Sequence, residues 1–193
     1  STPSKGLTLQ LLWNHRWEYD KGPERLLEIV RGLLRSRLEF VLHVVGQQFR
    51  EQPPAFAELR SLLADAQALG SWGFIRDHGE YLNLLGQCEV ALSTALHDFQ
   101  GLALMQACGA GCSPLAPARL VYPEWLDEAF LYPGDAADPQ REAAGAVAMI
   151  LALAEKRASG QSLPLADVSR FSSDVLLDEY RRVLSAVTLL AMT

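Results

Sequence analysis

The amino-acid sequence predicts an α/β protein in which helices cover both faces of a parallel, Rossmann-like sheet, the arrangement called doubly wound. Short apolar segments alternate about five times with longer segments whose apolar residues recur at helical spacing. The short segments are apolar along their length, as in strands that are buried on both faces. Such sheets bind ligands beyond the carboxyl ends of their strands, so a site is expected in the loops that follow the strands.

Apolar runs bounded by polar or glycine residues predict the strands. They fall at 7–13, 40–45, 72–75, 90–93, 113–116 and 129–132. Helical periodicity, opened in the first case by a proline at residue 23, predicts the helices. These fall at 23–34, 55–69, 78–87 and 101–109, followed by an alanine-rich helix at 139–157, a linker at 158–164 and an amphipathic helix at 172–190.

The bulk properties are those of one compact domain, with 193 residues of which 49% are hydrophobic and 21% charged. We expect that domain to run from residue 7 to residue 193, after a flexible lead-in or cloning remnant at 1–6. The net charge of −6 argues against a broad basic surface for nucleic acid. No apolar run reaches the ~18 residues of a membrane span, and residues 1–6 lack the apolar core of a signal peptide, so a cytoplasmic location is expected.

The three cysteines, Cys88, Cys108 and Cys112, lack the second pair of ligands that a zinc site needs. They lie in apolar surroundings, which is typical of buried cysteines in a reducing compartment. The sequence therefore predicts no metal site.

The loop after the first strand carries two cations, Arg16 and Lys21, shortly before a predicted helix. Two cations at a strand end can clamp a diphosphate. The alternative is a solvated loop in which the same cations pair with Glu18 and Asp20.

A second polar segment follows the fourth strand and ends at Gly101, which opens a helix. A helix N-terminus stabilises a phosphate through its free backbone N–H groups, and glycine lets a ligand approach the backbone closely. Asp98 can bind sugar hydroxyls, and Gln106, eight residues later, can bond a ribose. Alternatively, Asp98 caps the helix and Gln106 is a partly exposed helical residue.

Several histidines and aromatic residues near these loops allow two interpretations. His15 and Trp17 either shape a sugar pocket or pack in the interior, and Tyr122 belongs to a turn near the cleft. Local hydrogen bonding is favoured over proton transfer for His97, and core packing is favoured for His43.

Together, the two polar segments resemble the C-terminal domain of the retaining GT-B glycosyltransferases of group 1, the glycogen-synthase-like set. That family has an arginine and a Lys-Gly pair after the first strand, which here are Arg16 and Lys21-Gly22. The resemblance covers residues 9–123, and the segment FSSDVLLDEYRRVL is similar to the closing helix of the family.

The second part of the family pattern is an acid, an aromatic-x-Gly triplet and another acid eight residues after the first. Here these positions hold Asp98, Phe99-Gln100-Gly101 and Gln106, whereas the family has glutamate at both acidic positions. Aspartate is one methylene shorter than glutamate, and glutamine keeps an acceptor but has no charge.

The resemblance implies the C-terminal half of a GT-B fold and metal-independent transfer with retention. In the catalytic roles that it implies, Arg16 and Lys21 neutralise the leaving diphosphate and Asp98 holds hydroxyls of the transferred sugar. Backbone amides near the start of the helix bind other phosphate oxygens, and Arg76 lies near the base. The residues assigned to the donor are Phe99, Gln100, Gly101, Leu102, Gln106, Gly46 and Arg76.

Three stretches, WNHRWEYDKGPE, SWGFIRDHGEYLNLLGQCEVALSTALHDFQG and GCSPLAPARLVYPE, resemble more narrowly the tRNA-queuosine mannosyltransferase group. In that group a distinct N-terminal domain precedes this one, and the donor is GDP-mannose. The resemblance therefore implies GDP-mannose as a donor substrate, with no separate cofactor. It also implies an N-terminal partner domain in the parent chain, and tRNA as a partner through that domain.

Two other functions remain open at this stage. A module that binds a nucleotide sugar without catalysis is suggested by the uncharged Gln106. An epimerase of GT-B shape would share the diphosphate clamp.

Overall fold

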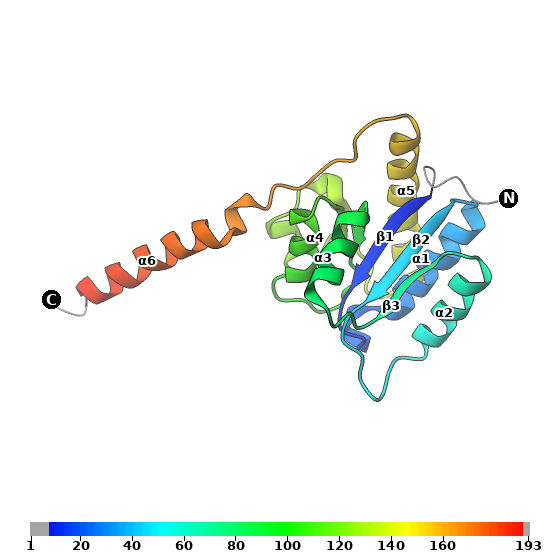
Figure 1. Ribbon diagram of the computed structural model, residues 1–193, viewed down its shortest axis with the longest axis horizontal. Coiled ribbons are helices and arrows are strands. Elements are labelled where there is room, and N and C mark those ends of the chain that lie inside the picture. The colour runs from blue at the N-terminus through cyan, green and yellow to red at the C-terminus, as the bar shows by residue number, and fades with distance from the viewer. Residues whose placement is uncertain (1–7, 191–193) are drawn as a thin grey trace.

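The computed structural model describes residues 8–190, the last five of them by their backbone alone, and shows a six-stranded parallel sheet flanked by helices (Figure 1). The prediction of a doubly wound sheet is confirmed. The expected lead-in at 1–6 lies outside the described residues. The strands are β1 (Leu9–Asn14), β2 (Phe40–Val45), β3 (Leu69–Gly73), β4 (Val90–Leu92), β5 (Ser113–Pro117) and β6 (Leu131–Tyr132).

The strand order is β3-β2-β1-β4-β5-β6, and every pairing is parallel. The chain builds outward from β1 to β3, then returns to place β4 on the other side of β1. The two directions of winding therefore separate between β1 and β4, which is where an open α/β sheet leaves a crevice for a ligand. Both polar segments singled out in the sequence follow these two strands.

Alternate side chains of the central strand, β1, belong to two separate hydrophobic cores, one on each face of the sheet. Leu11 and Trp13 belong to the core that α1, α2 and α5 cover, whereas Leu12 belongs to the core beneath α3 and α4. This alternation of faces is what a buried parallel strand provides. The helices are α1 (Pro23–Ser36), α2 (Ala55–Asp65), α3 (His78–Gln87), α4 (Leu102–Gly109), α5 (Pro139–Ala158) and α6 (Ser173–Leu190).

The third strand was predicted wrongly at 72–75, and the helix before it was predicted too long. Helix α2 ends at Asp65 because the chain reverses at Gln67, whose φ of 57° is left-handed, and Ala68 N donates back to the Leu63 carbonyl. The strand then starts at Leu69. Of the predicted strand at 129–132, the first two residues belong to a 3-10 turn, Glu128–Phe130, and the last two form β6.

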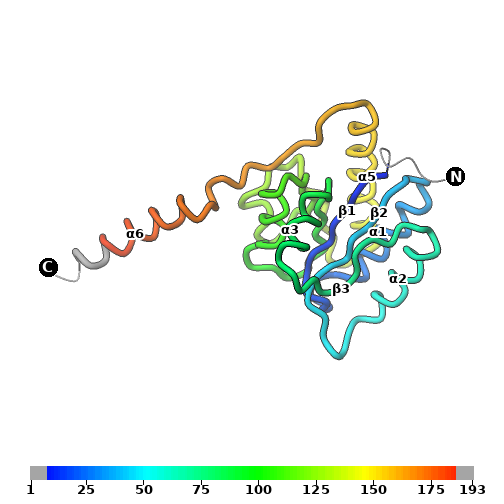
Figure 2. The backbone as a smooth tube through the Cα atoms, viewed as in Figure 1, coloured from blue at the N-terminus to red at the C-terminus, as the bar shows by residue number. Residues whose placement is uncertain are grey.

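Helix α6 lies apart from the body of the molecule, as the tube in Figure 2 shows. Four of its apolar side chains, Leu177, Tyr180, Val183 and Leu184, are more than half exposed. Across the described residues, no helix is long and apolar enough to cross a membrane.

A buried ion cluster connects the loop after β4 to helices α1 and α5. Glu142 of α5 is 1% exposed and forms ion pairs with Arg25 of α1, at 3.1 Å, and with Arg119. Arg119 also donates two hydrogen bonds to the carbonyl of Ala95, which lies in the loop after β4. The cluster therefore fixes the base of that loop.

Removing Glu142 would leave the buried guanidinium of Arg25 and the partly buried guanidinium of Arg119 without their counter-ion. We expect Glu142→Ala to lower the free energy of unfolding by about 3 kcal/mol or more, because removing one partner of a buried ion pair leaves an uncompensated charge in the interior. Urea unfolding measures this loss. The matched control is Glu58→Ala, whose exposed pair with Arg31 should be worth less than about 1 kcal/mol. Similar small losses in both variants would contradict a structural role for the cluster.

Candidate functional site

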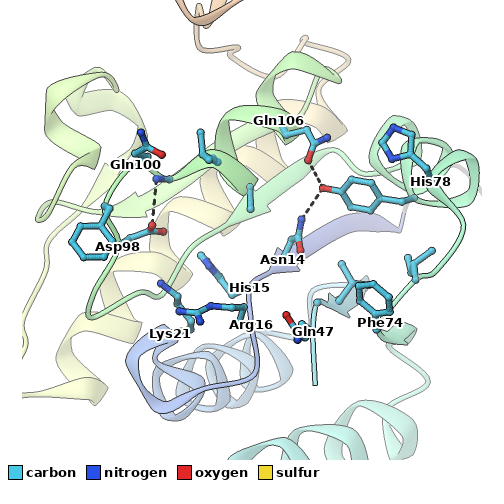
Figure 3. Close-up of a pocket in the computed structure, with 18 of the residues that line it drawn as sticks. Asn14, His15, Arg16, Lys21, Gln47, Phe74, His78, Asp98, Gln100 and Gln106 are labelled. Carbon is cyan, nitrogen blue, oxygen red and sulfur yellow. Dashed lines mark hydrogen bonds between the residues drawn. The ribbon is translucent and has the colours of Figure 1, made fainter. Parts of the chain in front are cut away.

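A cavity of about 730 Å³ opens at the carboxyl ends of β1, β2 and β4 (Figure 3). Four segments line it: the loop after β1, the end of β2, the segment from the end of β3 into α3, and the segment that runs into α4. Arg16, Lys21 and Asp98 lie on one side of the cavity, and Gln106 and Phe74 lie on the other. The cavity is therefore located where the sheet topology predicts a site.

Hydrogen bonds join the loop after β1 to the loop after β4. The carbonyl of Asp20 accepts from the backbone N–H groups of Leu96 and His97, at 2.8 and 3.0 Å. The Thr94 hydroxyl donates to the Lys21 carbonyl at 2.7 Å and accepts from the Trp13 indole N–H at 2.8 Å. Two segments about 75 residues apart in the sequence are thereby held edge to edge.

Lys21 is drawn into this junction and is 8% exposed. Its ammonium group donates to the carbonyl of His97 at 2.6 Å and lies 3.4 Å from a carboxylate oxygen of Asp20. An ammonium with three donors can keep these partners and still present a proton to the cavity. The fixed position of Lys21 makes it a preformed point charge for an anion.

Arg16 has a different setting, because it is exposed and pairs with Glu18 at 3.0 Å. Both ion pairs that the sequence offered as an alternative to an anion clamp are therefore present. They do not remove the cations from the cavity, since Arg16 and Lys21 both line it.

Helix α4 begins at the cavity wall with Gly101 as its N-cap, at a left-handed φ of 70°. The first α-helical bond runs from Met105 N to the Gly101 carbonyl, so the N–H groups just after Gly101 have no acceptor within the helix. A Cβ on Gly101 would lie 3.0 Å from the ring of Tyr122. The glycine is thus needed for its backbone angle and for the close packing of Tyr122.

Asp98 accepts hydrogen bonds from Gly101 N at 3.3 Å and from the Tyr122 hydroxyl at 2.9 Å. It therefore does reach the start of the helix, as the capping alternative proposed, while also lining the cavity. Burial opposes its ionisation, but the bond from Tyr122 and the charge of Lys21 outweigh burial and hold the pKa of Asp98 below its ordinary value. Asp98 is an anion at neutral pH.

His15 lines the cavity beside Asp98 and is 8% exposed. Burial lowers the pKa of His15 to about 4, so the ring is neutral at pH 7. Its Nε2 lies 3.0 Å from the Ser93 hydroxyl. Trp17, by contrast, stacks on Phe56 with ring centroids 4.2 Å apart and takes no part in the cavity, so packing is its role.

Gln106 faces the opposite side of the cavity. Its side-chain oxygen accepts from the Tyr81 hydroxyl at 2.8 Å, and that hydroxyl accepts from the Asn14 amide at 2.8 Å (Figure 3). The Gln106 carbonyl is thus engaged, and its NH2 group is left to donate.

The structure brings all ten predicted site residues to this one cavity, and their roles stay predictions. Gly46 is required there because a Cβ would lie 1.8 Å from the His15 carbonyl oxygen. Phe99 is 80% exposed and meets His97 edge to face. The ten residues are Arg16, Gly46, Lys21, Arg76, Asp98, Phe99, Gln100, Gly101, Leu102 and Gln106.

Sequence reasoning missed several residues that line the cavity, among them Asn14, Gln47, Phe74 and Tyr81. The first three stand at or just after strand ends, which was a usable signal. Tyr81 lies on a helix, at a position that the sequence pattern assigns to the apolar, inward face, so the pattern does not indicate a polar role for its hydroxyl.

His43, His97 and the three cysteines are not among the residues that line the cavity. His43 is 9% exposed, accepts from Ser71 N at 2.9 Å and lies 3.2 Å from the side-chain oxygen of Gln10, so its interior role is confirmed. The ring of His97 is exposed, and its carbonyl, not its ring, holds Lys21. The three cysteines are free and buried, and burial raises the pKa of Cys112 to about 11. Among the described residues, no cluster of three or more His, Cys, Asp or Glu side chains could hold a metal ion.

Comparison with known proteins finds relatives in sequence and in fold. The chain is 35% identical over 124 residues to the tRNA-queuosine alpha-mannosyltransferase of Drosophila melanogaster. That alignment covers 64% of this chain and 32% of the relative, so the chain matches about a third of the relative's length. No family profile matches the chain.

Two solved structures illustrate the likeness in fold. The C-terminal domain of a glycosyl transferase group 1 family protein, LpcC, of Francisella tularensis superposes with a TM-score of 0.60 at 18% identity, over 77% of this chain and 78% of that one. The pneumococcal O-GlcNAc transferase GtfA, solved with UDP and GlcNAc, superposes with a TM-score of 0.63 at 16% identity, over 95% of this chain and 38% of that one.

The strand order, the cavity at the switch point and these likenesses agree with the family pattern found in the sequence. The chain therefore has the fold of the C-terminal domain of a GT-B glycosyltransferase, and over 124 residues it is similar in sequence to a tRNA-queuosine alpha-mannosyltransferase.

Proposed function

We propose that this domain binds the nucleotide-diphosphate sugar GDP-mannose and presents it for sugar transfer with retention, without a metal ion. The observation that carries the proposal is the junction between the loops after β1 and β4, because it places Lys21 beside Asp98 and the start of α4. Cations and helical N–H groups suit a diphosphate, and a carboxylate suits sugar hydroxyls.

The chemistry follows from where charge develops. When the bond from the sugar to the diphosphate breaks, negative charge grows on the leaving phosphate oxygens. Lys21, Arg16 and the N–H groups at the start of α4 are the donors around that region of the cavity, and in this proposal they stabilise the transition state more than the ground state. Asp98, held as an anion, orients the sugar while the bond breaks.

The nucleotide extends across the cavity in this proposal. Gln106 faces the ribose, and the segment with Phe74 and Arg76 faces the base. An exposed aromatic ring and a guanidinium offer stacking and hydrogen bonds to a base. The choice of guanine follows the mannosyltransferase resemblance and is the most specific part of the proposal.

The acceptor belongs to a partner domain. We propose that an N-terminal domain of the parent chain holds it and that the acceptor is tRNA, as the name of the Drosophila relative indicates for that protein. The net charge of −6 gives this domain no general attraction for RNA, which supports placing the acceptor on another domain.

Titration calorimetry of this domain with GDP, GDP-mannose and UDP tests the proposal. We expect GDP and GDP-mannose to bind at micromolar to millimolar concentration and UDP to bind more weakly. Absence of binding to any of the three at millimolar concentration would refute the donor site.

Lys21→Ala separates phosphate recognition from base recognition. We expect the affinity for GDP to fall about tenfold or more, because the variant removes a charge-assisted contact, while the affinity for guanosine stays within about twofold. Calorimetry with both ligands measures the difference. Arg60→Ala is the control, because it removes an exposed cation of α2 that is outside the cavity and should affect neither ligand. Equal losses for GDP and guanosine would show that Lys21 does not contact phosphate.

A binding module without catalysis is the second candidate, because Gln106 replaces a charged family residue. The two differ in a protein that contains both domains, assayed with a labelled sugar donor. We expect the wild type to transfer sugar and Gln106→Glu to change the rate by less than about tenfold, because Tyr81 already engages the side-chain oxygen of Gln106. Turnover that appears only with glutamate at position 106 would favour the module.

A further inference from the structure

Tyr122 lies directly behind the candidate site without lining the cavity. It opens the short 3-10 turn η2 (Tyr122–Glu124) and is completely buried. Its hydroxyl lies 2.9 Å from Asp98 Oδ2 and 2.6 Å from the Ser93 hydroxyl. The edge of its ring supports Gly101, where a Cβ would come within 3.0 Å.

These contacts form part of a chain of four groups whose donors follow from chemistry. The Asp98 carboxylate only accepts, so the Tyr122 hydroxyl must donate to it. Tyr122 then accepts from the Ser93 hydroxyl, and Ser93 in turn accepts from Nε2 of His15, at 3.0 Å. The chain therefore runs in one direction from His15 to Asp98, and every bond in it depends on the next.

We propose that Tyr122 is a positioning residue that directs the Asp98 carboxylate at the sugar of the donor and, through Ser93, fixes the protonated nitrogen of His15. This inference rests on the proposed function, since it takes Asp98 as the group that meets the sugar. Lys21 and the helical N–H groups do not depend on the Tyr122 hydroxyl, so binding of the diphosphate does not require it.

A second buried tyrosine provides the comparison that a purely structural role requires. Tyr132 of β6 is also completely buried, and its hydroxyl donates to the Ser93 carbonyl at 2.6 Å. It bonds to the same residue as Tyr122 but makes no contact with Asp98. Deleting the Tyr132 hydroxyl removes its hydrogen bond to the Ser93 carbonyl, whereas deleting the Tyr122 hydroxyl removes two bonds, one of which is to Asp98 at the cavity.

Calorimetry with GDP and GDP-mannose on Tyr122→Phe and Tyr132→Phe tests the role. We expect Tyr122→Phe to lower the affinity for GDP-mannose about tenfold, because it removes a hydrogen bond to a charged group. The affinity for GDP should change by no more than about twofold. Tyr132→Phe should leave both affinities unchanged. Equal weakening of both ligands by Tyr122→Phe, or weakening by Tyr132→Phe of the same size, would overturn the proposal.

The titration of Asp98 gives a second measurement that needs no ligand. Carboxyl carbon NMR, with the Asp98 signal assigned from Asp98→Asn, follows the ionisation of this group beside Lys21 and His15. In Tyr122→Phe, burial still opposes the ionisation of Asp98 but the hydrogen bond that favours it is lost, so the pKa of Asp98 should rise. In Tyr132→Phe, the pKa of Asp98 should not change. An unchanged pKa in Tyr122→Phe would overturn the coupling.

The results distinguish a failure of the proposed function from a failure of the positioning role. If the wild type binds no nucleotide, the proposed function is wrong and the sugar-positioning role falls with it, whatever the titration shows. If the wild type binds GDP-mannose and Tyr122→Phe alters neither the preference nor the titration, the positioning role alone is wrong. Should Tyr122→Phe fail to fold, Ser93→Ala interrupts the chain one step earlier. We then expect a smaller weakening of GDP-mannose, and unchanged affinities would refute the chain.

Discussion

The candidate site depends on one junction, the backbone hydrogen bonds that hold the carbonyl of Asp20 against the loop after β4. The backbone N–H groups of Leu96 and His97 both donate to that carbonyl, and the Lys21 ammonium donates to the His97 carbonyl in the opposite direction across the junction. These bonds satisfy groups that would otherwise be buried without partners, so the two loops are joined at little cost to the fold. Without this junction, the cation from the first loop and the anion from the second would be independent surface charges.

The scaffold behind the junction is polar as well as apolar. Glu142 and Arg119 anchor the carbonyl of Ala95, and Ser93 anchors the hydroxyls of Tyr122 and Tyr132. Buried polar networks of this kind contribute less to net stability than to a single well-defined arrangement. In this domain the networks converge on residues 93–98, so they fix the backbone of the segment that carries Asp98.

The sequence predicted the sheet and the location of the site well, because both follow from local pattern and from topology. Strand 40–45 and helix 78–87 have the predicted bounds, since apolar runs and turn residues mark their ends. All ten candidate residues line one cavity, because parallel strands bring their carboxyl-end loops together. The third strand was misplaced because the chain reverses at Gln67, a residue that gives no turn signal.

Long-range hydrogen bonding was beyond the reach of the sequence. Tyr122 and Ser93 are 29 residues apart, and Trp13 and Thr94 are 81 apart, so no spacing rule connects either pair. The sequence places Tyr81 on a helix without indicating a role for its hydroxyl, and only the fold shows that hydroxyl between Asn14 and Gln106. Residues of the candidate site could thus be located from the sequence pattern, whereas the buried residues that hydrogen-bond to them could be found only from the structure.

The charges around the cavity set how an anion is expected to bind. Arg16 and Lys21 already have carboxylate partners, in Glu18 and Asp20, so a diphosphate has to replace existing pairs. For Arg16 that replacement costs little, because exposed ion pairs contribute only about 0–1 kcal/mol. Lys21 need not move, since its bond to the His97 carbonyl leaves donors free and the carboxylate of Asp20 lies 3.4 Å away. In the proposed donor complex, Lys21 is therefore the fixed cation that defines where the diphosphate lies, and Arg16 is the exposed cation that exchanges Glu18 for the diphosphate.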